Sequence, residues 1–154
     1  MGEPPYSSGS VGPRFLVDND LSPLIAKALE DFEFLDIRTV EGWLGSRDVP
    51  DEQIIPWLGQ TGTAWITHDR GAKRRHASAL KQHRVTVLWV RGKALSNFDH
   101  LEIVVKVLRQ LIEKMTKAHG PLHFRAGKTT GPTPTIEWAS DSRDRPKQHN
   151  QSRR

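Results

Sequence analysis

The stretch RFLVDNDLSP, residues 14–23, sets the expected fold of the chain. Residues 14–17 favour a buried strand, and two aspartates, Asp18 and Asp20, follow at once. Ser22 then suits the N-cap of a helix, and Pro23 suits its first helical position, where a missing N–H costs nothing. A buried strand that runs into carboxylates and then into a helix predicts the start of an α/β unit.

The same succession of strand and helix continues along the chain. The expected strands are residues 14–17, 32–37, 64–67, 85–90 and, at the edge of the sheet, 122–126. The expected helices are residues 22–29, a segment that starts between 48 and 51 and is ended by Gly59 and Gly62, then 72–82, and 96–115. We expect a loop at 38–50, and Pro56 predicts a kink or a late start in the second helix. The alternation predicts a three-layer α/β/α sandwich around a mostly parallel sheet of four to five strands.

Length and composition divide the chain into a domain and two polar ends. The chain has 154 residues, enough for one domain that buries about two thirds of its unfolded surface. We expect a disordered N-terminus at 1–13, one domain at 14–126, and an extended, basic, largely disordered tail at 127–154. The formal net charge is +5, which suggests an anionic partner, although part of the excess lies in the tail.

Several classes of protein are excluded by the residues present. There is no cysteine, which rules out disulfides, thiolate catalysis and cysteine zinc sites. No apolar run reaches the length needed to cross a bilayer, so we expect no membrane contact. The first residues lack the basic start and apolar stretch of a signal peptide, so we expect a cytoplasmic protein.

Carboxylates end two strands that the expected sheet order places side by side. In an open α/β sheet of order 2-1-3-4-5, ligands bind at the carboxyl ends of strands 1 and 3, where the order reverses. Asp18 ends the first strand and Asp69 ends the third. Two such charges about 4 Å apart repel by about 4 kcal/mol, so either one carboxyl is protonated or a cation lies between them. Oxygen ligands favour Mg²⁺ or Mn²⁺ over zinc, and Asp48, Asp51 and Glu52 are placed to reach the same edge.

Structural explanations compete with the metal site at single positions. An aspartate after a strand commonly closes a turn, and Asp20 is explained as an ordinary cap near Ser22. Asp51 and Glu52 suit the first turn of a helix because of the helix dipole. The pairing of Asp18 with the carboxylate at residue 69 is what favours metal binding.

A basic segment follows the third strand directly. Residues 70–84, RGAKRRHASALKQHR, carry six basic side chains and no acid. A solvated helix face is the ordinary explanation, but its position next to Asp69 favours binding of RNA phosphates. The residues expected to bind RNA are Arg70, Lys73, Arg74 and Arg75. His68 is expected as a half-exposed loop residue rather than a catalytic one, and Trp43, in the expected loop, is the one tryptophan considered for a ligand.

Three segments together resemble the PIN-like domain proteins, which include the VapC-type toxins of bacterial toxin–antitoxin modules. They are FLVDNDLSP, DVPDEQIIPWLGQTGTAWITHDR and VTVLWVRGKALSNFDHLEIVVKVLRQLIEKM, and the resemblance covers residues 14–116. It implies a Mg²⁺- or Mn²⁺-dependent endoribonuclease that leaves a 5′-phosphate and a 3′-hydroxyl and is silenced by a cognate antitoxin protein. Carried onto this chain, the catalytic and metal-binding acids are Asp18, Asp51 and Asp69, with Glu52 as a further ligand. A homodimer is compatible with this interpretation.

Two positions depart from the family pattern. Gly71 stands where such proteins often have another acid, and Asn19 stands where many have glutamate. These departures leave open a one-metal site, or RNA binding with weak or no cleavage. The position of Gly71 therefore keeps open a non-catalytic module that binds RNA or an antitoxin. A receiver-like phosphoacceptor domain shares much of this layout and ranks second, well behind the nuclease, because residues 90–92 after the fourth strand lack its hydroxyl residue.

Overall fold

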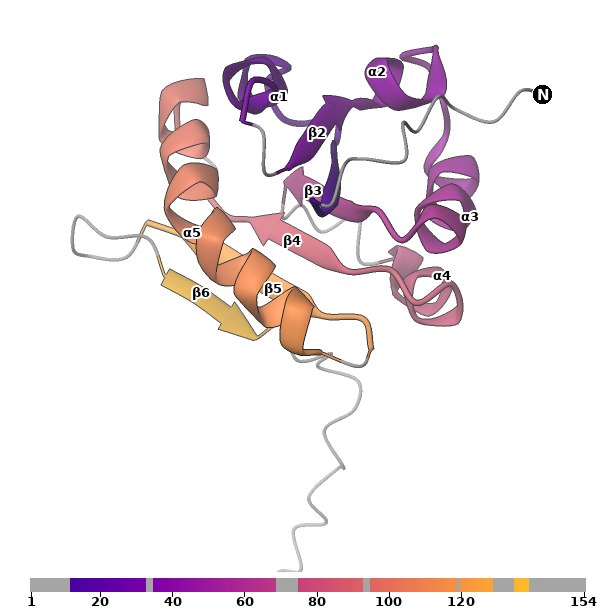
Figure 1. Ribbon diagram of the computed structural model, residues 1–154. Helices are drawn as coiled ribbons and strands as arrows, with labels where there is room; N and C mark the ends of the chain where they lie inside the picture. The colour runs from indigo at the N-terminus through magenta and orange to yellow at the C-terminus, as the bar shows by residue number, and fades with distance from the viewer. Residues whose placement is uncertain are drawn as a thin grey trace, which may run out of the picture.

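The structure is a computed structural model that describes residues 12–32, 35–68, 75–92, 95–118, 120–128 and 135–138. Within these ranges the chain forms one six-stranded sheet of order β2-β1-β3-β4-β5-β6, with helices on both faces (Figure 1). The strands are β1 (Arg14–Val17), β2 (Asp36–Thr39), β3 (Ala64–His68), β4 (Val87–Val90), β5 (His123–Gly127) and β6 (Thr135–Trp138). The helices are α1 (Leu24–Leu29), α2 (Val40–Leu44), α3 (Asp51–Thr61), α4 (Ala77–Gln82) and α5 (Asn97–Lys117).

The predicted fold class is confirmed. The first five strands are parallel and follow the expected order, so β1 lies between β2 and β3. The point where the strand order reverses therefore falls between β1 and β3, as expected. One expectation was wrong: β5 is not the edge of the sheet, because β6 pairs with it antiparallel. Residues 135–138, which form β6, belong to the segment expected as a tail.

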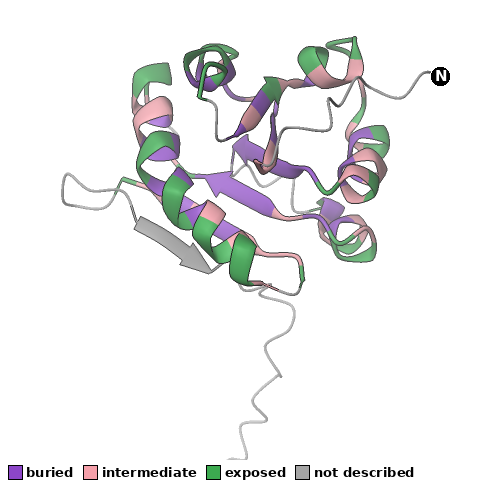
Figure 2. Ribbon diagram, in the orientation of Figure 1, coloured by how far each residue is buried: buried purple, intermediate pink, exposed green. Residues whose placement is uncertain are grey.

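Alternate residues of the strands supply two separate cores. Helices α1 and α5 cover one face, and helices α2, α3 and α4 cover the other (Figure 1). Phe15 and Val17 pack with the first pair of helices, whereas Leu16, between them, packs with the second group. Strands β3 and β4 are buried along their whole lengths, and the outer helix surfaces are exposed (Figure 2). Burial on both faces explains why these strands are continuous apolar runs.

Strand β2 begins later than the apolar run at 32–37 predicts. After α1 the chain turns, with Phe32 N–H donating to Leu29 O and Leu35 N–H donating to Phe32 O. The Phe32 side chain is 47% exposed and makes no part of the sheet. Pairing with β1 begins only at Asp36, whose N–H donates to Pro13 O. The expected boundary was wrong because an apolar turn was taken for the start of the strand.

The segment expected as a loop at 38–50 contains the end of β2 and the whole of α2. Thr39 caps α2, because its Oγ1 accepts a hydrogen bond of 3.1 Å from Gly42 N–H. Gly45 ends the helix in the left-handed region, at φ 78°, which glycine adopts without strain. The expected loop was therefore wrong. Thr39 at one end and Gly45 at the other bound a short helix of five residues. Trp43, expected in a loop, lies in this helix and donates from Nε1 to Phe15 O at 2.8 Å.

Helices α3 and α5 follow their capping signals. Helix α3 starts at Asp51, within the expected range, and continues through Pro56 to Thr61, so the late start is not observed. Gly62 ends it in the left-handed region. Helix α5 has the expected capping box, in which Ser96 Oγ accepts from Asp99 N–H and the Asp99 carboxylate accepts from Ser96 N–H.

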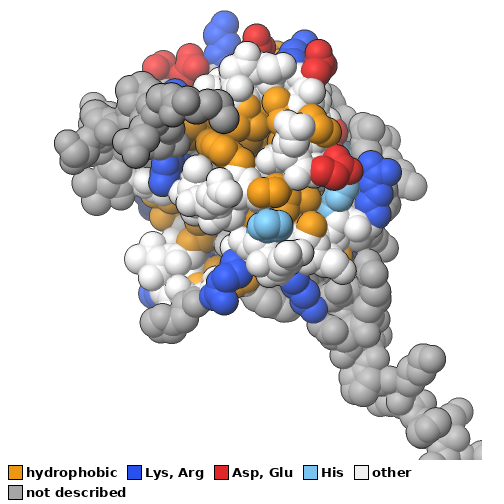
Figure 3. Space-filling view, turned by 90° about the vertical axis from the view of Figure 1, so that its right-hand side faces the viewer, with side chains coloured by type: hydrophobic (Ala, Val, Ile, Leu, Met, Phe, Trp, Pro, Cys, Tyr) orange, Lys and Arg blue, Asp and Glu red, His pale blue; other side chains and the backbone are white. Residues whose placement is uncertain are grey.

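The face formed by α2, α3 and α4 keeps apolar side chains at its surface (Figure 3). Trp43 and Trp57, both partly buried, lie 5.8 Å apart between ring centroids, and the Arg38 guanidinium lies 4.6 Å from the Trp43 ring. The two rings are tilted by 47° and join α2 to α3. In the described part of the chain, no helix is long and apolar enough to cross a membrane.

Candidate active site

The carboxyl ends of β1 and β3 meet as the strand order requires. Val17 pairs with Ile66, and Asp18 N–H donates to Ile66 O at 2.9 Å, so the ladder continues one residue beyond β1. This contact holds Asp18 beside Thr67, at the end of a strand that is buried throughout. Asp18 itself is only 4% exposed. A carboxylate in this position requires polar partners, because an unpaired buried charge is strongly unfavourable.

Two carboxylates from the β1–α1 loop converge on one hydroxyl of β3. Thr67 Oγ1 donates to Asp18 Oδ2 at 2.7 Å, and lies 3.2 and 3.3 Å from the two carboxylate oxygens of Asp20. Asp18 Oδ1 accepts from Asn19 N–H at 2.7 Å, and Asp20 Oδ1 accepts from His68 N–H at 3.2 Å. A threonine hydroxyl has one proton, so it cannot donate to both carboxylates at full strength.

The donor set at this edge fits a hard divalent cation. Carboxylate and hydroxyl oxygens are the ligands that Mg²⁺ and Mn²⁺ prefer, and no nitrogen or sulfur ligand competes in the Asp18–Asp20–Thr67 cluster. Two neighbouring carboxylates that share one hydroxyl donor place like charges side by side, which a cation would compensate. In the described ranges, no group of three histidine, aspartate or glutamate side chains forms. Asp69, the third expected ligand, follows β3 directly but lies outside the described residues.

Asp51 is placed by a different contact. It is the first residue of α3, and its Oδ2 lies 3.2 Å from Nε2 of His76, just before α4. The described residues therefore do not bring Asp51 into a three-ligand group with Asp18 and Asp20. Glu52, next in the first turn of α3, is exposed. Asp48 is also exposed, in the loop before α3, where its N–H donates to Ser46 Oγ.

Only one residue of the expected RNA-binding set is described. Arg75 lies in the turn before α4, with its Nε 3.4 Å from His76 Nε2. Arg70, Lys73 and Arg74 lie outside the described residues.

His68 differs from its expected place in a loop. It is the last residue of β3 and is 5% exposed, with Nε2 3.0 Å from Gly92 O. Its ring meets the ring of His100 edge to face, with centroids 5.2 Å apart. Burial between β3 and α5 therefore makes His68 a packing residue beneath the site, and its backbone N–H is what reaches Asp20.

Sequence reasoning missed three residues that the structure places at or beside the site. Asp20 was explained as a cap, Thr67 lay in the expected strand at 64–67, and His76 lay in the basic segment at 70–84 with no role assigned to it. Asp20 carried one signal, since it is a second acid two residues after the strand-end aspartate in RFLVDNDLSP. Thr67 and His76 carried none, because only the register of β1 on β3 and the packing of α4 on α3 select them.

Comparison with known proteins gives one match. The family described as PIN like domain matches residues 13–92, which include β1, β3, β4 and the cluster of Asp18, Asp20 and Thr67. No curated protein and no solved structure matches the chain.

Proposed function

The chain belongs to the PIN-like domain family, and from that premise we propose that it is a metal-dependent endoribonuclease. PIN-like domains have a nuclease-type fold, and the matched residues contain the strand ends where such a site would form. The proposal concerns hydrolysis of RNA phosphodiester bonds at the edge of the sheet where β1 and β3 end.

The observation that carries the proposal is the convergence of Asp18 and Asp20 on the hydroxyl of Thr67. The two acids would bind a Mg²⁺ or Mn²⁺ ion together with Asp69, which follows His68 along the chain. Thr67 and the N–H of Asn19 would hold the Asp18 carboxylate in one orientation. Such outer-shell hydrogen bonds orient metal ligands and raise metal affinity.

A divalent cation at this position would neutralise charge on the scissile phosphate and lower the pKa of a water for in-line attack. The protein side chains have separate tasks. Asp18, Asp20 and Asp69 would bind the ion. The basic residues Arg70, Lys73, Arg74 and Arg75 would hold phosphates on either side of the scissile bond, which positions the strand without reading its sequence.

Asp51 and Glu52 receive a secondary role in this proposal. Asp51 is paired with His76. We therefore propose that Asp51 does not bind the ion directly. It orients either the attacking water or the basic turn before α4. Glu52 is exposed at the positive end of α3, where it would join the site only through a solvent molecule.

The test is cleavage of a labelled single-stranded RNA by the full chain with Mg²⁺ or Mn²⁺. We expect Asp18→Asn to reduce the rate more than about 100-fold, because even outer-shell changes at metal sites cost about 10- to 100-fold. Asp20→Asn and Asp69→Asn should also reduce it strongly. Asp31→Asn is the matched control, since this exposed aspartate follows α1 and lies outside the cluster.

A metal-binding measurement accompanies the cleavage assay. Mg²⁺ at 100 times its dissociation constant should stabilise the wild type by about 2.7 kcal/mol, seen as a rise in Tm. Asp18→Asn should abolish this rise, and Asp31→Asn should keep it. Equal cleavage by the wild type, Asp18→Asn and Asp69→Asn would contradict the nuclease proposal.

We further propose that the nuclease is the toxin of a toxin–antitoxin pair, with a cognate antitoxin protein as its partner. Expression of the chain alone should then arrest growth, and the Asp18→Asn variant should not. A neighbouring reading frame whose product binds the chain and blocks cleavage would identify the antitoxin.

The same experiments separate the other two functions. A non-catalytic RNA-binding module would bind the labelled RNA without cutting it under any metal condition. A receiver-like domain would form phosphoaspartate from acetyl phosphate. Lys128, the one lysine near the end of β5 that could serve a receiver, is paired with Asp99 instead.

A further inference from the structure

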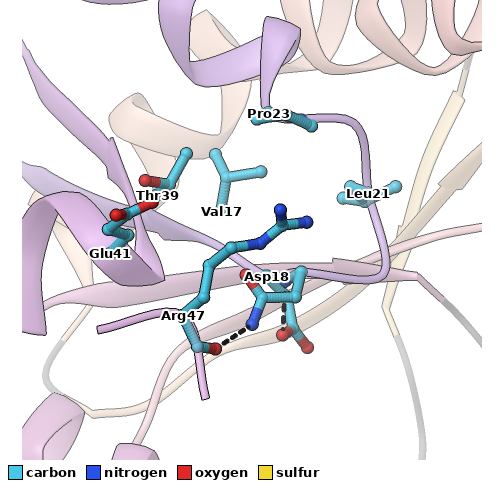
Figure 4. A pocket seen from close by; sticks show the side chains of 8 residues that line it. Val17, Asp18, Leu21, Pro23, Thr39, Glu41 and Arg47 are labelled. Carbon is cyan, nitrogen blue, oxygen red and sulfur yellow. Dashed lines mark hydrogen bonds between the residues drawn. The ribbon is translucent and has the colours of Figure 1, made fainter. Parts of the chain in front are cut away.

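A small pocket opens beside Asp18, on the side away from β3. It has a volume of about 130 Å³ and lies between the β1–α1 loop and the chain around α2 (Figure 4). The side chains that matter here are those of Asp18, Leu21, Pro23, Thr39, Glu41 and Arg47. Thr39 and Glu41 form one wall and Leu21 and Pro23 the other, while the Arg47 side chain reaches between them (Figure 4).

The loop that carries Arg47 is held in place by several contacts. Gly45 turns the chain at φ 78° after α2, and Ser46 Oγ accepts from Asp48 N–H at 3.3 Å. Asn19 Nδ2 donates to Arg47 O at 2.7 Å, and Asn19 N–H donates to the Asp18 carboxylate. Asn19 thus links the backbone of Arg47 to Asp18. The position of Arg47 relative to Asp18 is therefore built into the fold.

The pocket presents one positive and one negative side chain. Arg47 is exposed, and within the described residues its guanidinium has no ion pair, so its charge is available to a ligand. Glu41 is also exposed, on the wall that it forms with Thr39 (Figure 4). A guanidinium binds the oxygens of a phosphate in bidentate fashion, and a carboxylate accepts hydrogen bonds from vicinal hydroxyls such as those of ribose. The apolar surface of Leu21 and Pro23 suits the carbon face of a sugar ring.

We propose that this pocket binds one ribonucleotide of the substrate strand, next to the scissile phosphate, with Arg47 on its phosphate and Glu41 on its 2′-hydroxyl. The pocket has room for one sugar ring, and the base projects into solvent, so this subsite reads RNA against DNA and not base sequence. The 2′-hydroxyl is the group by which a protein distinguishes RNA from DNA at a given position. The proposal rests on the nuclease function above, because it assigns the adjoining nucleotide of that substrate.

The test measures binding separately from cleavage. Fluorescence anisotropy gives the Kd of the full chain, in EDTA, for a labelled single-stranded RNA and for the DNA of the same sequence, over a range of salt concentrations. Arg47→Ala should weaken binding of both strands about 5- to 10-fold, the range of a charge-assisted contact in partial solvent. The dependence of log Kd on log salt should fall by about 0.7, the value for one phosphate of a single strand.

Glu41→Ala should act on the choice of sugar. Removing a negative charge strengthens binding of both strands somewhat, but the loss of the 2′-hydroxyl contact should lower the preference for RNA over DNA about threefold or more. Arg109→Ala and Glu113→Ala are the charge-matched controls on α5, which covers the other face of the sheet, and should leave the salt dependence and the RNA preference unchanged. Arg47→Lys should keep the salt dependence and lose part of the affinity.

The outcomes separate this proposal from the nuclease function. Cleavage that depends on Asp18, together with wild-type binding and salt dependence in Arg47→Ala, overturns the subsite and leaves the nuclease. An unchanged RNA preference in Glu41→Ala overturns the sugar contact. A different result would support the subsite and reject the nuclease. In it no form cleaves RNA, Arg47→Ala binds more weakly with a smaller salt dependence, and Glu41→Ala loses part of its preference for RNA over DNA. A wild type that does not bind RNA overturns the subsite directly.

Discussion

The hydroxyl of Thr67 donates a hydrogen bond of 2.7 Å to the buried carboxylate of Asp18, joining residues 49 apart in sequence. This contact connects the carboxyl ends of β1 and β3, where the proposed site lies. The same hydroxyl lies within reach of Asp20, so the two carboxylates share one donor from Thr67. The hydroxyl therefore brings two like-charged side chains side by side, as a divalent cation would require.

Replacing Thr67 by valine should therefore affect both stability and metal binding. Valine keeps the shape of the side chain, which is fully buried, but removes the donor. We expect the free energy of unfolding in EDTA to fall by about 1–2 kcal/mol, the cost of leaving a buried acceptor with fewer partners. The affinity for Mg²⁺ should fall about tenfold or more, because Asp18 and Asp20 lose the group that orients them.

Urea unfolding in EDTA and the Mg²⁺ dependence of Tm measure these two effects. Thr67→Ser is the control, because it keeps the hydroxyl and loses only a methyl group. A valine variant as stable as the wild type, with unchanged Mg²⁺ affinity, would show that the hydroxyl does not organise the two acids.

The pair formed by Asp51 and His76 supports a second prediction. The two side chains are 19% and 9% exposed and join the first turn of α3 to the turn before α4. We expect the double-mutant cycle of Asp51→Asn and His76→Gln to give a coupling free energy of about 0.5–1 kcal/mol. Urea unfolding of the four proteins measures it.

RNA cleavage by the same four proteins tests the role of Asp51 in the reaction. If Asp51 acts on the substrate itself, Asp51→Asn loses activity while His76→Gln retains most of it. Equal losses in both single variants would instead mean that the pair acts by holding the basic turn in place.

The adjacency of the ends of β1 and β3 could be predicted from the sequence. Strand–helix alternation fixes the parallel order, and that order places the residue after Val17 beside the end of β3. Local pattern was sufficient because the two strands are continuous apolar runs with carboxylates at their ends. The role of Asp20 could not be predicted in the same way, since a residue two positions beyond a strand can face either side of the loop. Its direction depends on a hydrogen bond from His68 N–H, a tertiary contact.

The pocket beside Asp18 was not predictable for a related reason. Its wall belongs to α2, a helix of five residues whose sequence VEGWL contains a glycine and has low helical preference. Thr39 and Gly45 define this helix from its two ends, while Trp43 anchors it to β1 through Phe15 O. Packing of Trp43 thus outweighs the low helical propensity of this segment. The sequence pattern alone indicates a loop.

Gly59 provides a test of how closely α3 and α4 pack. A Cβ added at Gly59 would lie 2.4 Å from the backbone oxygen of His83, which follows α4. Glycine to alanine in a helix normally stabilises it by about 1 kcal/mol. Here we expect Gly59→Ala to destabilise the protein by about 1–3 kcal/mol, because backbone atoms must move to relieve the overlap. Gln60→Ala, at the exposed neighbour, should change the free energy of unfolding by less than about 0.5 kcal/mol in the same urea titration.

Asp99 links the start of α5 to the end of β5 and makes stability depend on pH. Its carboxylate accepts hydrogen bonds from Lys128 and from Ser96, and these lower the pKa of Asp99 from 3.8 to about 2. Because the folded protein holds the charged form, Asp99 contributes stability that is fully present above about pH 4 and is lost as the pH falls through about 2. We expect the wild type to have a higher Tm than Asp99→Asn between pH 5 and 7, with the difference shrinking from about pH 4 and absent only below about pH 2. Thermal unfolding followed by circular dichroism across this range measures it, and a difference in Tm that is constant from pH 7 to pH 2 would contradict the assignment.

The Lys128→Met background tests the cause of the lowered pKa. In this background the difference in Tm between the protein with Asp99 and its Asp99→Asn variant should be smaller, since the hydrogen bond from Lys128 is the largest cause of the lowered pKa.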